Sequence, residues 1–314
     1  MILTVTLNTA LDITYRTDGL VPHTTHRVGE VVERAGGKGL NVARVLAALG
    51  HETVVTGFAG GRTGDVVREL LGGCGGRGVV RPVDALVPIS GSTRRTITVV
   101  DAATGRTTRL NEAGPTVSTG EWTAFLSGYD RLVAGAEAVA LCGSLPPGIH
   151  VGAYAELIRR ARALGVPVLL DTSGEPLRRG VAARPDLVKP NADELAQLTG
   201  ARDPLRAAHD TRRRGAHTVI ASLGPDGVLA VTPDGIWQAT PPAPAQGNPT
   251  GAGDSVVAGI LSGLVERLPW PTRLSRAVAL STATVLAPVA GGFDTTAYEE
   301  LLPKVKVTDR RPGA

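Results

Sequence analysis

Residues 36–58 read GGKGLNVARVLAALGHETVVTGF, and this stretch decides the fold class. Within it, Val42, Val45, Leu46 and Leu49 recur at the spacing of one helix face. A short apolar run at 53–58 follows and is typical of a buried strand. A helix followed at once by a buried strand indicates an α/β protein.

The same alternation continues along the rest of the chain. Helical spacing recurs at 154–164 and 256–265. Short runs rich in Val, Leu and Ile, each interpreted as a strand, lie at 2–7, 138–141, 166–170 and 218–222. We therefore predict a single domain over 1–314 whose central, mainly parallel sheet carries helices on both faces.

Two stretches break this rhythm, at 13–33 and 94–110, where polar residues alternate with β-branched ones. In the second stretch, 96–100 and 107–110 flank a turn around Gly105, which is a hairpin pattern. We predict that the two stretches form a small β-sheet lid over a cleft. A surface hairpin without a role is the alternative.

The composition narrows the function classes. Hydrophobic residues make up 42% of 314, which is enough for a sizeable core, and the net charge of +4 comes from scattered charges. Binding of nucleic acid is disfavoured because no basic stripe is interleaved with the few aromatics. Two cysteines make no disulfide framework, and the sequence shows neither a signal peptide nor a membrane span. We expect a cytoplasmic protein without a membrane partner.

The strongest chemical motif is GAGDS at 251–255, directly before the predicted helix 256–265. Glycines at a helix start let backbone N–H groups approach an anion, and the helix dipole adds positive potential there. A carboxylate at this point, Asp254, is suited to accept a proton from an attacking hydroxyl in phosphoryl transfer. The alternative is that Asp254 simply caps the helix.

A second motif is GGKG at 36–39, followed by Asn41, which we place on the helix face opposite the core. Its glycines allow close backbone approach, and Lys38 brings a point charge suited to phosphate. The motif is not a P-loop, because Lys38 is followed by Gly39 instead of Ser or Thr. A flexible turn with a solvated lysine is the alternative.

A third motif is KPNADE at 189–194, after the apolar pair Leu187-Val188. Asn191 and Glu194 suit a magnesium–phosphate site reached through water, but the same spacing fits a capping box. The loops at 142–148 and 222–227 also follow strands, where ligands bind in open α/β sheets. The second of these loops equally fits a hairpin turn.

One motif is interpreted as a decoy. Residues 73–78, GCGGRG, match the GxGxxG pattern of dinucleotide-binding proteins. They follow the helical pattern at 66–71 instead of a strand, whereas the fingerprint needs a strand, a turn and a helix. We interpret them as a loop, which disfavours an NAD-dependent dehydrogenase.

Taken together, the motifs resemble the ribokinase/PfkB family of sugar kinases over nearly the whole chain. The resemblance rests on GGKGLNVARVL, KPNADEL, SLGPDG and GAGDS in this order. The MILTVTLN start, STR at 92–94 and GSLPPG at 143–148 resemble the phosphosugar branch, which contains 1-phosphofructokinase, tagatose-6-phosphate kinase and the minor 6-phosphofructokinase. The implied fold is a ribokinase-like three-layer sandwich with a β-sheet lid.

The resemblance also implies a role for each matching position. Asp254 would be the catalytic base, beside an anion hole formed by the N–H groups of Gly251, Ala252 and Gly253. The sugar hydroxyls would be held by Asp12, Gly37 and Asn41. The phosphate already on the sugar would be bound by Arg27, Lys38, Arg94 and Ser144. ATP with Mg²⁺ would be organised by Lys189, Asn191 and Glu194, the last two through water. The nucleotide site would be lined by Ser222, Gly224 and Gly227.

Three departures from the family pattern bear on the sugar. Thr9 stands where relatives usually have proline, Arg95 follows Arg94, and Asn248-Pro249-Thr250 precedes GAGD. None removes a catalytic group. The expected reaction is ATP-dependent conversion of fructose 1-phosphate to fructose 1,6-bisphosphate, with tagatose 6-phosphate and fructose 6-phosphate as the next acceptors. A catalytically silent sugar-phosphate sensor is the alternative from another class. The resemblance also implies a homodimer formed through the lid.

Overall fold

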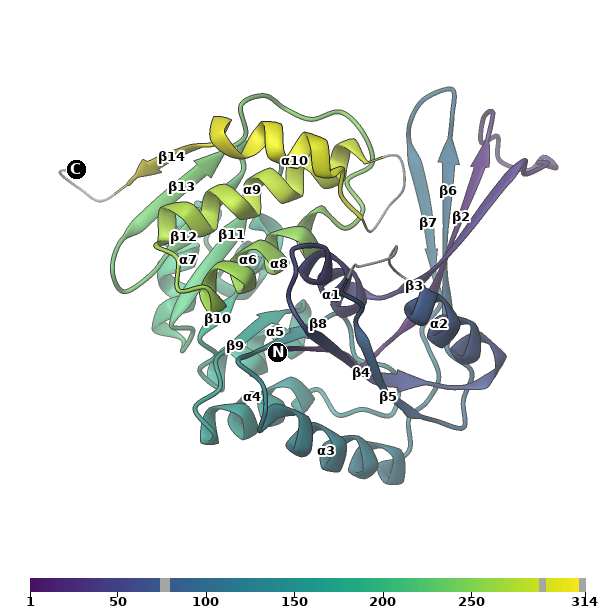
Figure 1. Cartoon of the computed structure of the whole chain (residues 1–314), viewed down its shortest axis with the longest axis horizontal. Coiled ribbons are helices and arrows are strands. Elements are labelled where there is room, and N and C mark those ends of the chain that lie inside the picture. The colour runs from purple at the N-terminus through teal and green to yellow at the C-terminus, as the bar shows by residue number, and fades with distance from the viewer. Residues whose placement is uncertain (74–79, 288–291, 311–314) are drawn as a thin grey trace.

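The computed structural model describes residues 1–73, 80–287 and 292–310. Its main body is a large sheet between two layers of helices, and a small sheet projects from one end (Figure 1). This is the three-layer α/β arrangement predicted from the sequence. The residues of the GxGxxG decoy from 74 onward lie outside the described ranges.

The large sheet contains every strand predicted from the short apolar runs. In spatial order its ten described strands are β14 (Lys306–Asp309), β13 (Ile236–Thr240), β12 (Val228–Val231), β11 (Thr218–Ser222), β10 (Leu187–Val188), β9 (Val168–Asp171), β8 (Ala138–Cys142), β1 (Ile2–Thr6), β4 (Thr53–Ala59) and β5 (Val83–Pro88). Pairing is parallel from β5 through β11 and antiparallel from β11 to β14. The central strand β1 is buried along its whole length, which explains why its sequence is a run without alternation.

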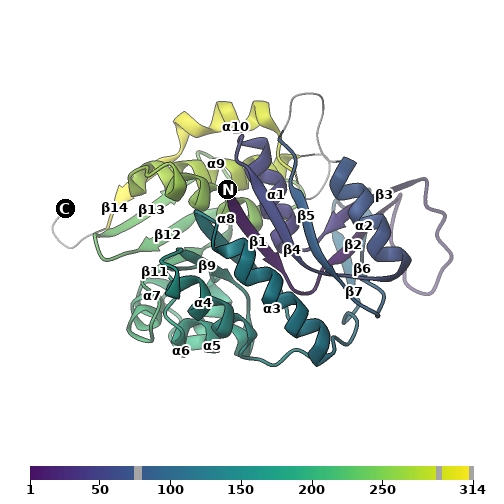
Figure 2. The ribbon, with the colours of Figure 1, turned by 60° about the horizontal axis from the view of Figure 1, so that its bottom comes forward.

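Helices cover both faces of this sheet, as Figure 2 shows from a second direction. One face carries α3 (Thr119–Val133), α4 (Ala153–Ala163), α5 (Gly174–Ala182), α6 (Ala192–Thr199) and α7 (Pro204–Arg213). The other face carries α1 (Lys38–Ala48), α2 (Gly61–Gly73), α8 (Ala252–Val265), α9 (Trp270–Leu286) and α10 (Thr295–Leu301). Among the described helices, none is long and apolar enough to span a membrane.

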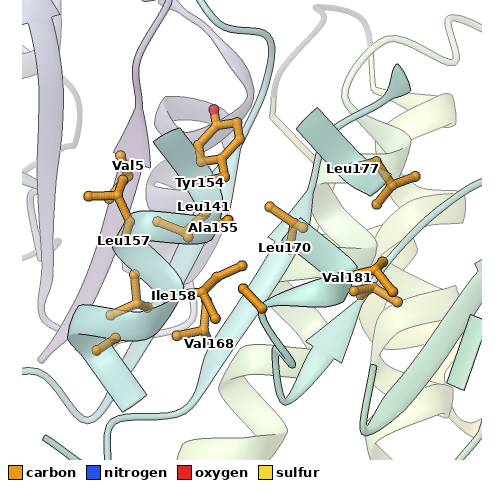
Figure 3. Packing of buried hydrophobic residues seen from close by; sticks show 14 of the residues in the cluster. Val5, Leu141, Tyr154, Ala155, Leu157, Ile158, Val168, Leu170, Leu177 and Val181 are labelled. Carbon is orange, nitrogen blue, oxygen red and sulfur yellow. The ribbon is translucent and has the colours of Figure 1, made fainter. Parts of the chain in front are cut away.

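The hydrophobic core beneath α4 and α5 holds the end of β8 in place (Figure 3). Leu157 and Ile158 of α4 are fully buried against Val5 and its neighbours on β8 and β9. Truncating either side chain to alanine would cost about 2–5 kcal/mol, because a cavity would remain. On the same helix, the buried Tyr154 donates its hydroxyl hydrogen to the carbonyl oxygens of Cys142 and Gly143, at 2.9 and 3.1 Å. The chain leaving β8 is thereby held in place.

The small sheet has the order β3 (Glu30–Gly36), β2 (Ala10–Thr17), β6 (Arg94–Asp101) and β7 (Thr107–Asn111). It confirms the predicted lid strands and the hairpin around Gly105, whose φ is +69°. The limits differ from the prediction. Strand β2 begins at Ala10 because its pairing with β6 starts there, and residues 18–29 connect β2 to β3 without strand structure.

The two faces of the small sheet differ in polarity. In the observed register, Asp12 pairs with Thr96, and Ile13 pairs with Ile97. The face that contains Asp12 lines a cleft, and Leu110, on the opposite face, is 57% exposed. Because side chains alternate along a strand, the polar/apolar alternation in the sequence separates these two faces.

Candidate active site

A cleft of about 960 Å³ lies between the small sheet and the carboxyl ends of the parallel strands. The ends of β1, β8, β9, β10 and β11 all contribute side chains to it, together with the starts of α1 and α8. Carboxyl ends of parallel strands meet at one edge, so motifs far apart in the sequence converge here. Thirteen of the seventeen residue positions assigned from the resemblance, among them Asp254, Lys38 and Arg94, line the cleft.

The start of α8 places Asp254 at the floor of the cleft. Gly251 precedes the helix with a φ of +89°, a conformation that favours glycine. The N–H of Ala252 donates to the carbonyl oxygen of Pro249 at 3.1 Å, and Ala252 does not line the cleft. The predicted anion-hole role of Ala252 is therefore corrected, because its N–H is already used by the turn. Gly251 and Gly253 do line the cleft.

Asp254 is almost fully buried, with 6% of its surface exposed. Burial raises its pKa from 3.8 to about 6, against the opposing effect of the Lys38 ammonium. Its Oδ2 accepts a hydrogen bond of 2.8 Å from Nδ2 of Asn41. A carboxylate with this pKa is ionised near neutral pH and still basic enough to take up a proton.

Asn41 is not on a solvent-facing side of its helix, as the sequence pattern suggested. It is 8% exposed and packs where α1 crosses α8. Its Oδ1 accepts from Nη1 of Arg44 at 3.0 Å, which leaves Nδ2 to donate to Asp254. The face that looked polar from the sequence is thus a second buried face, turned toward the Asp254 carboxylate.

A buried ion cluster lies beside Asp254. Oδ1 of Asp171, at the end of β9, is 3.2 Å from Nζ of Lys38 and 3.3 Å from Nζ of Lys189. Asp171 and Lys189 are 1% and 5% exposed. Burial alone would lower the pKa of Lys38, but Asp171, Asp254 and Glu194 raise it above its ordinary value. The Lys38 ammonium is therefore held charged at the edge of the cleft, with Lys189 on the other side of the same carboxylate oxygen.

Gly37 brings Lys38 to this position. It precedes α1 with a φ of +112°, and a Cβ there would lie 2.7 Å from Cγ2 of Thr6. The start of the helix therefore packs directly against the end of β1. Any larger residue would push Lys38 away from Asp171.

Asn191 and Glu194 form the capping box that the sequence left open as an alternative. Oδ1 of Asn191 accepts from the N–H of Glu194, and Oε2 of Glu194 accepts from the N–H of Asn191, both at 2.8 Å. Both side chains still line the cleft. The cap does not use Oε1 of Glu194, so the structural and the binding interpretation are compatible.

These residues fit a magnesium ion held mainly by phosphate. No group of three or more His, Cys, Asp and Glu side chains in the described part of the chain is placed to hold a metal alone. Mg²⁺ commonly binds through one or two carboxylates, water and substrate phosphates. Glu194 offers one such carboxylate oxygen beside the two lysines.

The lid end of the cleft is also cationic. Arg94 is half-buried, and its Nε donates to the carbonyl oxygen of Asn8 at 3.1 Å. Burial lowers the pKa of Arg94 below its ordinary value, while Asp12 and Glu112 oppose this shift. Burial likewise raises the pKa of Asp12, with Arg94 and Arg109 opposing. Asp12 therefore lies between two guanidinium groups on the cleft face of the lid.

Arg109 connects the lid to the main body. From β7, its Nη2 donates to Oγ1 of Thr250 at 2.6 Å, directly before Gly251. The lid thus contacts the loop that leads into α8, the helix that carries Asp254.

Three predicted site residues lie elsewhere. Arg27 is exposed in the connection 18–29, at the end of the lid hairpin remote from the cleft, and does not line the cleft. Gly224 and Gly227 are also absent from its lining. Both belong to the tight turn between the antiparallel strands β11 and β12, and a Cβ at Gly227 would lie 2.0 Å from the carbonyl oxygen of Ala239. The hairpin interpretation of this loop is confirmed.

Other residues of the cleft were not predicted from the sequence, notably Asp171, Asn8 and Arg109. Asp171 is the last residue of the buried strand β9, and Asn8 lies just beyond the buried strand β1, so the position of a polar residue at the end of an apolar run was an available signal. For Arg109 the only signal was the alternation of residues along its strand. This pattern assigns Arg109 to one face of the strand without showing that the face lines a cleft.

Comparisons with known proteins agree with this geometry. The sequence profile described as "pfkB family carbohydrate kinase" matches residues 4–296. A tagatose-6-phosphate kinase of Staphylococcus epidermidis is 33% identical, over 98% of this chain and 100% of that protein. A mutant of phosphofructokinase-2 from Escherichia coli superposes with a TM-score of 0.88 at 30% identity, over 96% of this chain and 98% of that one. A Thermotoga maritima protein described as "Possible 1-phosphofructokinase" gives 0.86 at 25% identity, over 99% and 100%.

Proposed function

The chain belongs to the pfkB family of carbohydrate kinases, and from this premise we propose that it phosphorylates a ketohexose monophosphate with ATP. The observation that carries the proposal is the pair of cationic ends of one cleft. Lys38 and Lys189 lie beside the base Asp254, and Arg94 lies at the lid end with Ser144. A ketohexose carrying phosphate at one terminal carbon and receiving phosphate at the other would place one anion at each end.

In the proposed reaction, Asp254 takes the proton from the acceptor hydroxyl. The hydroxyl oxygen forms a bond to the γ-phosphorus of ATP, while the bond from that phosphorus to the β,γ-bridging oxygen breaks and ADP leaves. Asn41 orients the carboxylate for this transfer, because its amide hydrogen bond fixes Oδ2. The free N–H groups at the start of α8 and the two lysines would stabilise the charge on the transferring group. We assign Lys38 to this group instead of to the acceptor phosphate because it lies beside Lys189 and Asp254.

Mg²⁺ would supply charge neutralisation on the nucleotide phosphates, held on the protein side through water by Glu194 and Asn191. Lys189, at the end of β10, lies in the same wall of the cleft as Ser222. We assign these residues to the nucleotide side and the lid residues Asp12 and Arg94 to the sugar side. A silent sensor is disfavoured, since a protein that only binds has no use for a buried carboxylate that costs stability.

The lid also supports a homodimer. Val31 and Leu110 lie on its apolar face, away from the cleft, and are 54% and 57% exposed. A second copy of the lid would cover this face. Sedimentation velocity of the purified protein would check it, and a monomer at micromolar concentration would contradict it.

The test of function is ADP release with Mg–ATP across a panel of acceptors. Fructose 1-phosphate, tagatose 6-phosphate and fructose 6-phosphate are compared with free fructose and free tagatose. We expect turnover with at least one phosphate ester at a kcat/KM far above that of its free sugar. Equal use of free and phosphorylated sugars would contradict the phosphorylated acceptor, and binding without turnover would indicate the sensor.

A further inference from the structure

Asn8 lies at the point where the lid meets the main sheet, and its contacts join two residues assigned to the acceptor phosphate. It lies two residues beyond the end of β1 and is 5% exposed. Its Nδ2 donates to Oγ of Ser144 at 3.1 Å and to the carbonyl oxygen of Ala113 at 3.0 Å. Its own backbone carbonyl accepts from Nε of Arg94.

The orientation of the Asn8 amide follows from its partners. Because the carbonyl oxygen of Ala113 can only accept, the atom facing it must be the NH₂ group. The oxygen of the amide instead lies against Gly114, where a Cβ would come within 2.3 Å of it. Both hydrogens of Nδ2 are therefore used, one on the lid side and one on Ser144.

This arrangement decides what Ser144 can do. A hydroxyl that accepts a hydrogen bond on oxygen keeps its own hydrogen to donate. Ser144 is exposed and lines the cleft, so that hydrogen is available to a phosphate oxygen. The N–H donors of Arg94 are also divided between the protein and a ligand. Its Nε and one Nη1 hydrogen are used on the carbonyl oxygens of Asn8 and Glu112, which leaves the rest of the guanidinium for a ligand.

We propose that Asn8 is a positioning residue that assembles the acceptor-phosphate site, and so sets the preference for a phosphorylated over a free sugar. The proposal rests on the proposed function. Asn8 itself need not touch the phosphate. Its side chain makes Ser144 a donor, and its backbone carbonyl holds Nε of Arg94, so that a lid residue and a main-body residue act on one anion.

The test is Asn8→Asp, which keeps the shape but removes both donors. Its carboxylate would accept the Ser144 hydrogen and repel the phosphate. We expect kcat/KM for the phosphate ester to fall about 10- to 150-fold, with the KM for ATP and the use of the free sugar little changed. In a Ser144→Ala background the same substitution should cost much less, because the residue acts through Ser144.

Thr9→Ala is the matched control. Thr9 is buried in the same turn, and its Oγ1 donates to the carbonyl oxygen of Thr6 without contacting Ser144 or Arg94. It should lower thermal stability and leave the ratio of phosphorylated to free sugar unchanged. An equal loss on both sugars in Asn8→Asp, additivity with Ser144→Ala, or the same ratio change in Thr9→Ala would overturn the proposal.

A second readout separates this inference from the function itself. Thermal unfolding in inorganic phosphate is compared for the wild-type protein and Asn8→Ser, a smaller change for the case in which the aspartate variant does not fold. A smaller phosphate-induced rise in Tm for Asn8→Ser supports the role of Asn8, and an equal rise contradicts it. If the wild-type protein turns over no phosphate ester, the proposed function fails, and this comparison still decides the role of Asn8.

Discussion

The two ends of the cleft handle charge in opposite ways. At the strand end, Asp171, Lys189 and Asp254 are each at most 6% exposed, and their charges are balanced against one another. At the lid end, β7, which brings Arg109 to the cleft, is exposed along its whole length. Burial at the strand end raises the pKa of Asp254, and a group that exchanges a proton near neutral pH needs such a shift. Exposure at the second end leaves charges to attract and hold a ligand.

Removing the base should give the largest effect. We expect Asp254→Asn to lower kcat by about 10²- to 10⁴-fold, because a positioned general base contributes about that much. Acceptor binding should change little, since the lid end is untouched. Steady-state kinetics with the best acceptor measure this. Asp193→Asn, an exposed acid in the first turn of α6, is the control.

The Asp254→Asn variant should also be more stable than the wild-type protein. The pKa of Asp254 is about 6 in the folded state against 3.8 ordinarily, so ionising it opposes folding above pH 6. The difference corresponds to about 3 kcal/mol, fully present above pH 6 and absent below pH 4. Thermal unfolding of both proteins at pH 8 and pH 4 checks it. A lower Tm for the variant at pH 8 would show that the carboxylate stabilises the fold.

Substitution of Arg94 tests the lid end alone. We expect Arg94→Ala to lower kcat/KM for the phosphate ester about 10- to 150-fold, because a charge-assisted contact is lost. The free sugar should be little affected. Arg95→Ala is the matched control, since its side chain is 55% exposed and pairs with Glu112. Equal losses with both sugars would remove Arg94 from the phosphate site.

The pH dependence of activity probes the buried end. Below pH 6, kcat should fall about tenfold per pH unit, since the protonated Asp254 cannot accept a proton. The negative charge of Asp171 contributes to the raised pKa of Asp254. In Asp171→Asn the acidic limb of the profile should therefore move to lower pH. A limb that does not move would mean that another group controls it.

The smallest effect is expected for Arg109, which joins the lid to the loop before Gly251. Arg109→Ala removes the hydrogen bond to Thr250, which is exposed and worth about 0.5–1.5 kcal/mol. We expect a loss of about 2- to 12-fold in kcat/KM, shared between the acceptor and ATP, because the contact links the lid to the loop before Gly251. Arg106→Ala near the tip of the same hairpin should have no effect. A loss confined to the acceptor would place Arg109 in the sugar site instead.

The sequence predicted what local pattern determines. Strand and helix spacing located the main sheet, and Gly37 and Gly251 marked the starts of the two helices that face the cleft. The sequence did not show which residues lie close together across the sheet. The ion pairs of Asp171 with Lys38 and Lys189 depend on which strand ends become neighbours. Arg27 was misplaced for a related reason, since proximity to lid strands in the sequence does not show which end of the hairpin faces the cleft.

The distribution of the site along the chain has a consequence for protein synthesis. All four lid strands and Lys38 and Asn41 precede residue 112, whereas Asp254 follows Asn41 by 213 residues. Since a chain emerges from the ribosome N-terminal end first, the residues proposed to hold the sugar are synthesised long before the proposed base. A nascent chain that stops before α8 would carry acceptor-side groups but no means to activate a hydroxyl. In the proposed reaction, an incomplete chain could therefore bind an acceptor but not phosphorylate it.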